Sequence, residues 1–519
     1  MRTRSSLLSC VAASLAMALP SGTARALVVA REVIDAVPKQ VTPPEVLQEV
    51  PAALAGEAPV ASGLTQSQLV ALGRFLFNNE TFQGNGRTCA TCHPANNNLT
   101  IDPQFIATLP ANNPLFVAET NPALVNLENP VLLRSLALIC ENLDGFDRPC
   151  VFRGVPHTLA LGTSTTPPLA SPPAPGNIRV PGTDPPVELA NSTGWSADGA
   201  PIGDGARGEL RLFALGAVVQ HFPRTLNRVP GVDFRVPSDL ELDALLAFQL
   251  SLGRQADVDL ASLTFKNPVV EFGKEVFQDQ SINTGGRCSL CHDNASANRP
   301  PTNPNAGRNT IANTRVELTA NTPAFLLQPA VIAVDGGFGK PPALSPTIPP
   351  RTPLPAPGFG DGTFDAPPLI EAAATPPFFH NNSAATIEAA VGFFASPEFN
   401  QPAPIISLNT DKAAAIAAFL RAIGATELID RATGNNNAAI GSSVPVGRGF
   451  IGTAVANTKD AIKVLVEGVY LLFPEAQQDL AAAQVLEDLA FLAPAPALRN
   501  RLLAQANAKL AEARTAIVE

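Results

Sequence analysis

Two stretches of the chain share the pattern Cys-x-x-Cys-His, at residues 89–93 and 288–292. Two thiols three residues apart can reach both vinyl groups of one haem and form thioether bonds, and the adjacent histidine then ligates the iron. Zinc would need four nitrogen or sulfur ligands per site, and a thioredoxin-type pair needs neither the histidine nor the duplication. We therefore expect two covalently bound haem c groups, held by Cys89, Cys92 and His93 and by Cys288, Cys291 and His292.

The two motifs lie inside a longer internal repeat. The segment LGRFLF at 72–77 precedes the first motif, and FGKEVF at 272–277 precedes the second. Apolar residues at helical spacing predict a leading helix over residues 64–79, and Thr65 with Gln68 forms a candidate capping box at its start. The apolar face is repeated before the second motif, which predicts a second leading helix.

Each repeat also ends in a predicted helix. The sequence from Ser238 to Glu241 is a capping signal for a helix over 242–252, and a second closing helix is expected over 413–423. Both closing helices contain an Ala-Phe pair, at 247–248 and 418–419. A leading helix, a Cys-x-x-Cys-His motif and a closing helix describe a cytochrome c domain, so we expect two of them in tandem.

The N-terminus has the features of a secretory signal peptide. Arg2 and Arg4 precede an apolar stretch over 7–19, and Ala24 and Ala26 supply small residues before the expected cleavage point. We expect cleavage after residue 26 and a periplasmic or secreted protein. No uncharged apolar run of 18 or more residues follows the leader, so no transmembrane segment is expected after cleavage.

The charge and the cysteine content further limit which class of protein this chain can be. Lys and Arg number 35 against 45 Asp and Glu, a net charge of −10, which argues against a nucleic-acid binder. Outside the leader and the two motifs only Cys140 and Cys150 remain, and in an oxidising compartment we expect a disulfide rather than two free thiols. Both methionines, Met1 and Met17, lie in the leader, so no thioether ligand is left for a metal.

Several segments resemble the bacterial dihaem cytochrome c peroxidase superfamily, which includes the methylamine-dehydrogenase maturation enzyme and, more distantly, the dihaem rubber oxygenases. The resemblance covers residues 62–427. It rests on LGRFLFNNETFQGNGRTCATCHP, FRGVPHTLAL, TGWSADGAP, FGKEVFQDQSINTGGRCSLCH, FDAPPLIEAAATPPFFHNNSAATIEAAVGFF and AAIAAFLRAIGA. It implies that the N-terminal haem meets the oxidant, that the C-terminal haem supplies an electron, and that Trp195 relays it, where a lone Trp would otherwise be ordinary packing.

The chain departs from this superfamily at the second haem. Peroxidases of the family usually place a methionine about fourteen residues after the histidine of a Phe-His turn, and here that position is Phe394, which cannot ligate iron. The maturation enzyme uses a tyrosine, but Tyr470 lies outside the resemblance. The second iron is then five-coordinate or bound by another group. His380 is our candidate ligand, and a hydrogen-bonded turn residue is its alternative role.

The first haem lacks a family feature too. Peroxidases of this group place a glutamate near the distal face, and the matching stretch here, 213–224, contains no carboxylate. Its polar candidates are Gln220, His221 and Arg224. Three roles stay open for His221: it transfers protons while Arg224 stabilises charge, it ligates the iron, or it simply ends a helix.

These observations predict a mainly α fold with two cytochrome c-type haem domains in tandem and a C-terminal helical extension. The tail is Ala/Leu-rich at helical spacing, interrupted at Pro474 and at 494–496. The expected segments are a signal peptide (1–26), a lead-in (27–61), a first haem unit (62–263), a second haem unit (264–427), a linker (428–457) and a helical tail (458–519).

The leading functional expectation is reduction of hydrogen peroxide at the N-terminal haem, with electrons from a small donor protein of the cytochrome or cupredoxin type. An oxygenase or maturation enzyme that uses dioxygen or peroxide on a larger organic or protein substrate is the second hypothesis, and a non-catalytic electron carrier is the third. The resemblance also implies a calcium ion between the two domains, although no cluster of ligands in the sequence identifies its site.

Overall fold

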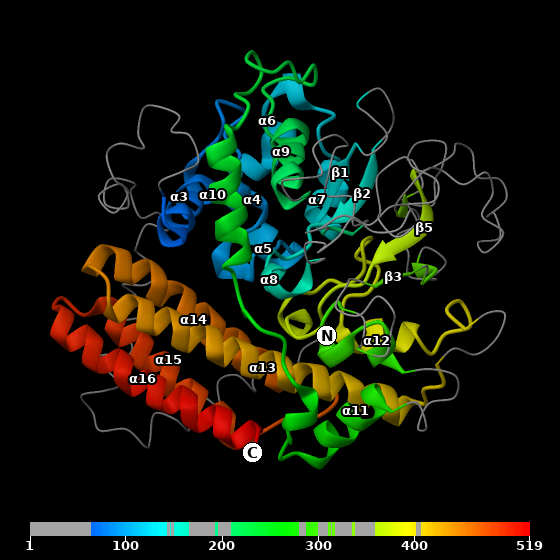
Figure 1. The fold of residues 1–519 in the computed structure, drawn as a ribbon, viewed down its shortest axis with the longest axis vertical. Coiled ribbons are helices and arrows are strands. Elements are labelled where there is room, and N and C mark those ends of the chain that lie inside the picture. The colour runs from blue at the N-terminus through cyan, green and yellow to red at the C-terminus, as the bar shows by residue number, and fades with distance from the viewer. Residues whose placement is uncertain are drawn as a thin grey trace, which may run out of the picture.

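The computed structural model is mainly helical, with few and short strands (Figure 1). The expected signal peptide and lead-in lie outside the described residues. The structure describes residues 64–142, 146, 150–165, 193–195, 209–279, 287–298, 301, 310–312, 314–316, 335–337, 359–400 and 406–519.

The first unit surrounds the motif at 89–93 with short helices and one hairpin. Its elements are α3 (Gln66–Asn79), α4 (Cys89–Cys92), η3 (Ala95–Asn97), α5 (Pro103–Thr108), η4 (Pro114–Phe116), α6 (Val117–Thr120), η5 (Pro122–Leu124), α7 (Pro130–Leu136), β1 (Leu138–Glu141), β2 (Val151–Gly154), α8 (Leu161–Ser164), α9 (Glu209–His221) and α10 (Asp239–Leu250).

The second unit repeats the helical pair and adds a small sheet, in which β5 pairs antiparallel with β3 and parallel with β4. Its elements are η6 (Leu260–Ser262), α11 (Pro268–Gln278), η7 (Cys288–Leu290), η8 (Asp293–Ala295), β3 (Ile311–Ala312), β4 (Asp335–Gly337), β5 (Phe359–Asp365), η11 (Ala372–Ala374), α12 (Ile387–Phe393) and α13 (Thr410–Ile440).

The predicted repeat is confirmed by one helix crossing that occurs twice. In the first unit α3 packs on α10, and a Cβ on Gly73 would lie 1.9 Å from the Ala244 carbonyl oxygen. In the second unit α11 packs on α13, and a Cβ on Gly273 would lie 1.9 Å from the Ala415 carbonyl oxygen. Only glycine allows backbones to approach this closely, so each leading helix is fixed against its closing helix.

The Ala-Phe pairs of the closing helices pack onto the same leading helices. Phe248 contacts Phe77 at a ring separation of 5.2 Å, and Phe419 contacts Phe277 at 5.4 Å. The capping box predicted at Thr65 is present, with Gln68 Oε1 accepting from the Thr65 amide at 2.8 Å. The sequence therefore predicted the leading and closing helices. The face expected in α3 is buried at Leu72 and Leu76, but in the second copy Phe272, expected on the matching face of α11, is 39% exposed.

The disulfide between Cys140 and Cys150 is also confirmed. The two Cα atoms are 5.5 Å apart, and the bond closes the antiparallel β1–β2 hairpin, where Cys140 faces Phe152. The hairpin lies beside α7 and α9 (Figure 1).

The expected linker at 428–457 is wrong, because this segment is helical. α13 runs on to Ile440, and α14 (Val444–Val466) follows after three residues. Asn436 is fully buried and donates to Glu487 Oε1 at 2.8 Å and to Asn507 Oδ1 at 3.0 Å. These tertiary contacts outweigh the low helix propensity of an Asn/Gly-rich stretch.

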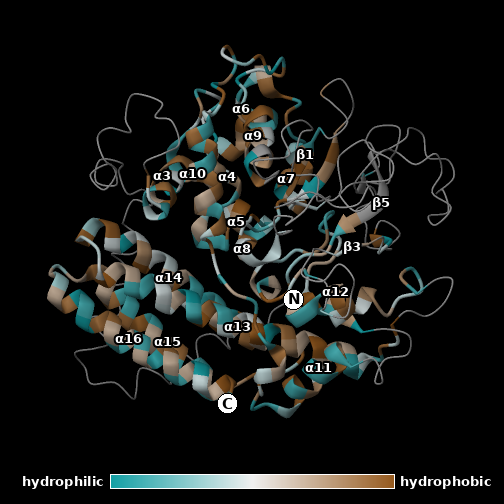
Figure 2. Cartoon of the chain, viewed as in Figure 1, coloured by the Kyte–Doolittle hydropathy of each residue, from teal (hydrophilic) through white to brown (hydrophobic). Residues whose placement is uncertain are grey.

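The tail forms helices as expected, and two of them start at the predicted proline breaks. α15 (Pro474–Leu492) and α16 (Pro496–Ile517) pack with α13 and α14 as a four-helix bundle, and each carries both apolar and polar residues (Figure 2). One apolar core is shared between the second unit and the bundle, and it includes Phe277 of α11 and Ile517 of α16. The tail therefore completes the second unit.

The two units touch through polar contacts. The side-chain amide of Asn98, just after the first motif, donates to Asp460 Oδ2 of α14 at 2.7 Å and to the Ala374 carbonyl at 3.1 Å. Arg431 of α13 donates to Asn98 Oδ1 at 3.1 Å. The bundle thus contacts the first motif region as well as the second unit.

We expect Gly73→Ala and Gly273→Ala each to lower the free energy of unfolding by about 3 kcal/mol, because the added methyl group collides with a helix backbone. Urea unfolding measures the change. Gly434→Ala in α13 is the matched control, since nothing lies within 4 Å of its added Cβ, and it should leave stability unchanged or raise it by up to about 1 kcal/mol. Equal stability of all three variants would contradict the close crossing.

Candidate functional site

The first Cys-x-x-Cys-His motif forms the short helix α4 and ends at His93. His93 Nδ1 lies 2.9 Å from the Leu99 carbonyl oxygen. A carbonyl only accepts, so Nδ1 carries the proton and Nε2 keeps its lone pair. Burial lowers the pKa of His93 to about 4, which keeps the ring neutral.

The second motif repeats this arrangement. Cys288 begins η7, and His292 Nδ1 lies 3.0 Å from the Pro367 carbonyl oxygen. Burial lowers the pKa of His292 to about 4, so this ring too is neutral with a free lone pair on Nε2.

None of the four motif cysteines is in a disulfide, and all four are only partly exposed. Burial raises the pKa of Cys89 to about 12, of Cys92 to about 11 and of Cys288 to about 12. Thiols with such pKa values stay protonated at neutral pH. A thioredoxin-type redox pair needs a reactive thiolate, so it is disfavoured. Covalent haem attachment requires cysteines that are not in a disulfide next to a neutral, oriented imidazole, so both motifs fit that group.

A cavity of about 430 Å³ lies beside the second motif. Cys288 and His292 line one part of it, and Thr100 and Ile101, which follow the first motif, line another. Its wall is mainly apolar. The cavity therefore reaches residues of both units.

Trp195 lies on the wall of this cavity. Its indole Nε1 donates to the Gly154 carbonyl at 2.7 Å, and its own carbonyl accepts from the Asp365 amide at 2.8 Å. The tryptophan thus bridges β2 of the first unit and β5 of the second. Its expected role as an electron relay stays a prediction.

His380 lines the same cavity as His292. It is 3% exposed and stacks on Phe364 with ring centroids 3.8 Å apart. Burial lowers the pKa of His380 to about 4, so this part of the cavity wall is a neutral imidazole. Phe394 also lines the cavity. It stands at the position where peroxidases of the resembled superfamily usually have a methionine. Ligation by His380 stays a prediction.

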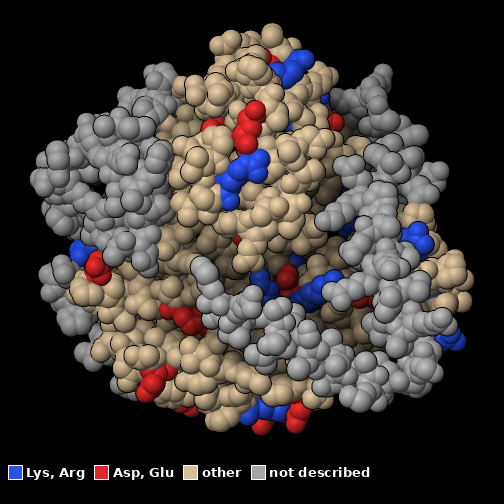
Figure 3. Space-filling model, turned by 180° about the vertical axis from the view of Figure 1, so that it is seen from behind, with Lys and Arg blue, Asp and Glu red and all other residues tan. Residues whose placement is uncertain are grey.

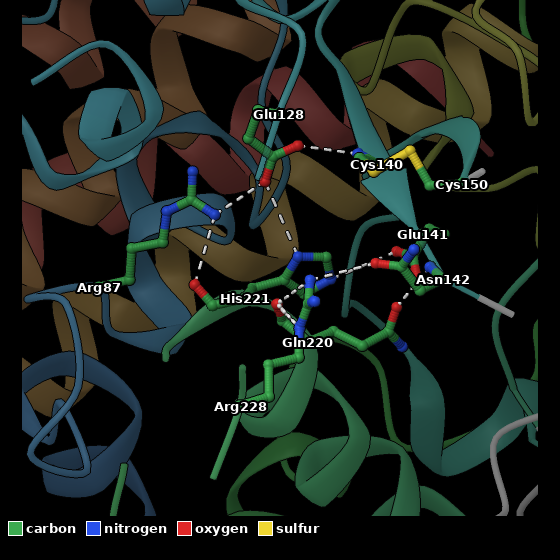
Figure 4. Close-up of a disulfide and its surroundings, with 9 residues drawn as sticks. All are labelled: Arg87, Glu128, Cys140, Glu141, Asn142, Cys150, Gln220, His221 and Arg228. Atoms are coloured by element: carbon green, nitrogen blue, oxygen red, sulfur yellow. Dashed lines mark hydrogen bonds and ion pairs between the residues drawn. A yellow bond between two sulfur atoms is a disulfide. The ribbon is translucent and has the colours of Figure 1, made fainter. Parts of the chain in front are cut away.

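A buried charge cluster surrounds His221, the last residue of α9 (Figure 4). His221 Nδ1 lies 3.8 Å from Glu128 Oε1, and Nε2 lies 3.6 Å from Glu141 Oε1. Burial alone would lower the pKa of His221, but the two carboxylates raise it to about 9. The imidazole is therefore held protonated at neutral pH.

Glu128 anchors this cluster. Its carboxylate accepts from Arg87 Nη1 at 2.8 Å and from the Cys140 amide at 2.8 Å. Burial acts to raise the pKa of Glu128, but Arg87 and His221 hold it below its ordinary value. The stretch at 213–224 lacks a carboxylate, and the fold supplies two from earlier segments.

The other two polar candidates from the sequence, Gln220 and Arg224, make contacts of a different kind. Gln220 Oε1 accepts from the Asn142 amide at 2.8 Å, which ties α9 to the end of the hairpin. Arg224 is exposed and donates to the Val232 carbonyl at 2.5 Å. Arg87 is the arginine that pairs with Glu128 in the cluster, and the sequence analysis missed it although a Gly-Arg pair precedes both motifs.

Among the described residues, no group of three or more His, Cys, Asp or Glu side chains is arranged to hold a metal ion. No helix in the described part of the chain is long and apolar enough to cross a membrane. On the face drawn in Figure 3, charged residues of both signs are few and scattered.

Comparisons with known proteins give no assignment. No family model matches the chain, and a search of curated proteins finds no match.

We expect the stabilising effect of His221 to depend on pH. Its pKa rises from 6.5 in the unfolded chain to about 9 in the fold, so this stability is fully present below pH 6.5 and is lost as pH rises through 9. Urea unfolding from pH 6 to 10 should show wild type and His221→Gln converging. Arg501→Gln, an exposed change on α16, should run parallel to wild type. A His221→Gln difference that is constant with pH would rule out the protonated imidazole.

Proposed function

We propose that this chain is an exported dihaem c-type oxidoreductase of the dihaem cytochrome c peroxidase superfamily. It reduces hydrogen peroxide at the haem of the first motif, with electrons supplied through the haem of the second motif by a small redox donor protein. The observation that carries the proposal is the repeated motif itself. In both copies two cysteines outside any disulfide stand beside a histidine whose Nδ1 is hydrogen-bonded to a backbone carbonyl.

The repeated helix crossing supports the division into two cytochrome c-type units. Gly73 and Gly273 each fix a leading helix directly before a motif. Bound haem would supply the iron at which peroxide is reduced and the means to store and pass electrons. Cys89, Cys92 and His93 would hold one group, and Cys288, Cys291 and His292 the other.

The chain contributes acid–base groups at the first site. The protonated His221 can donate a proton to a peroxide oxygen, which is the role of a general acid. The His221 carbonyl accepts hydrogen bonds from Asn85 and Arg87, just before Cys89, so the cluster lies beside the first motif. This supports proton transfer by His221 over ligation, since a protonated imidazole has no lone pair for iron.

The second site contributes an apolar enclosure. Trp195 lines the cavity on the side toward the first unit, which suits a relay between the two sites. His380 is the candidate sixth ligand on the same wall.

A second function draws support from the same cavity. It is mainly apolar, and Phe364, Phe394 and Phe399 line it. Such a wall suits an apolar organic group better than a small polar oxidant. An oxygenase or maturation enzyme that acts on a larger substrate is therefore the alternative.

We expect the purified protein to exceed the mass of its polypeptide by two haem groups. Cys89→Ala with Cys92→Ala should remove one covalent haem, and Cys288→Ala with Cys291→Ala the other, because each pair forms its own thioether bonds. Intact mass and haem staining measure this. Cys140→Ser with Cys150→Ser is the control and should keep both groups. A colourless protein would defeat the proposal.

We expect the reduced protein to bind carbon monoxide at the first site and to turn over hydrogen peroxide when given a reduced donor protein. Absorption spectra and stopped-flow kinetics measure both. His221→Gln should lower kcat/KM for peroxide by about 100-fold, the usual contribution of a general acid. Two six-coordinate irons in both redox states, with no peroxide turnover, would leave only electron transfer.

A further inference from the structure

Glu141 occupies a distinctive place in the cluster around His221. It is the last residue of β1, adjacent to the disulfide-bonded Cys140, and pairs across the hairpin with Val151. The disulfide and the strand pairing therefore fix the backbone that carries this carboxylate. Figure 4 shows Glu141 facing the imidazole ring from the hairpin side.

Exposure increases across the cluster from the inside outward. The side chain of Glu128 is 0% exposed, that of His221 is 11% exposed and that of Glu141 is 18% exposed. Both carboxylate oxygens of Glu128 accept hydrogen bonds, one from Arg87 and one from the Cys140 amide, so Glu128 is a fixed negative charge beside His221. Glu141 is the member that reaches solvent.

The inner side of the cluster is tied to the first motif. The His221 carbonyl accepts from the Asn85 side-chain amide at 2.9 Å and from Arg87 at 3.5 Å. Both donors lie just before Cys89. The end of α9 is thus held against the segment that leads into α4, and a displacement of His221 would be felt at the motif.

We propose that Glu141 is the proton-uptake residue of the first site, held within reach of His221 by the Cys140–Cys150 disulfide. This inference rests on the proposed function. In each transfer His221 Nε2 first gives its proton to the substrate oxygen. Glu141 then takes up a proton from solvent on a carboxylate oxygen and passes it to His221 Nε2. Both groups return to their starting protonation states, and the supplied electrons reduce the peroxide.

Glu141 acts through His221, so it is a positioning and relay residue. Charged groups face the imidazole from each element around it: Arg87 before α4, Glu128 before α7, Glu141 on β1 and Arg228 after α9, which donates to the Gln220 carbonyl at 3.4 Å. Among them the two carboxylates raise the pKa of His221. Loss of Glu141 removes one of these two.

The test compares Glu141→Gln with Glu119→Gln in the full-length haem protein. Glu119 pairs with Arg134 at the surface, with a side chain 29% exposed, so the control removes the same charge elsewhere. We expect Glu141→Gln to lower kcat for peroxide by about 10-fold to 100-fold and to move the alkaline limit of the pH profile downward. Glu141→Asp should restore part of the rate because it keeps a carboxylate.

A second readout does not depend on turnover. The C–O stretching frequency of carbon monoxide bound to the reduced protein responds to the charge of nearby groups. Its pH titration should move to lower pH in Glu141→Gln and stay in place in Glu119→Gln. An unchanged midpoint and an unchanged pH profile in Glu141→Gln would overturn the assignment. Absence of carbon monoxide binding in the wild type would instead overturn the proposed function.

The disulfide is tested separately. Cys140→Ser with Cys150→Ser should reproduce the slower turnover and the shifted titration while keeping both haem groups. Wild-type kinetics in this variant would overturn the positioning role of the disulfide. If the variant does not fold, Cys150→Ala alone, which breaks the disulfide but keeps the buried Cys140 side chain in place, gives the same comparison.

Discussion

The organisation of this protein depends on one steric constraint, the direct contact between a leading helix and the backbone of a closing helix. At Gly73 and again at Gly273 no side chain separates the two backbones. The chain that leaves each leading helix therefore starts from a fixed point, and the Cys-x-x-Cys-His motif follows shortly after. The histidine of each motif then meets a backbone carbonyl, that of Leu99 or of Pro367, which orients its ring.

Around this repeated frame the two units differ in what they add. The first adds a disulfide-closed hairpin and a buried ionic cluster, in which Arg87, Glu128 and His221 compensate one another's charges. The second adds an apolar cavity and shares its core with the bundle. A polar surrounding at one motif and an apolar one at the other would tune two like groups to different tasks.

Local signals made much of the fold predictable from the sequence. The capping boxes and the proline breaks at 474 and 496 each act within a few residues, and the structure follows them. The linker prediction failed because burial of Asn436 against Glu487 depends on a partner in another helix. Glu128 and Glu141 were missed for the same reason, since nothing near them in the sequence shows that the fold brings them to His221. Trp195 was singled out only because its segment resembles a known family, and periodicity alone would not have pointed to it.

The last helix also determines when the second unit can finish folding. The amide of Lys266 donates to the Ile517 carbonyl, and that of Glu519 donates to the Thr264 carbonyl, so the start of this unit pairs with residues made some 250 positions later. The apolar clusters of the first unit need nothing beyond residue 252. As the chain emerges in order from its N-terminus, the first half can consolidate early, while the other half must wait until α16 has emerged too.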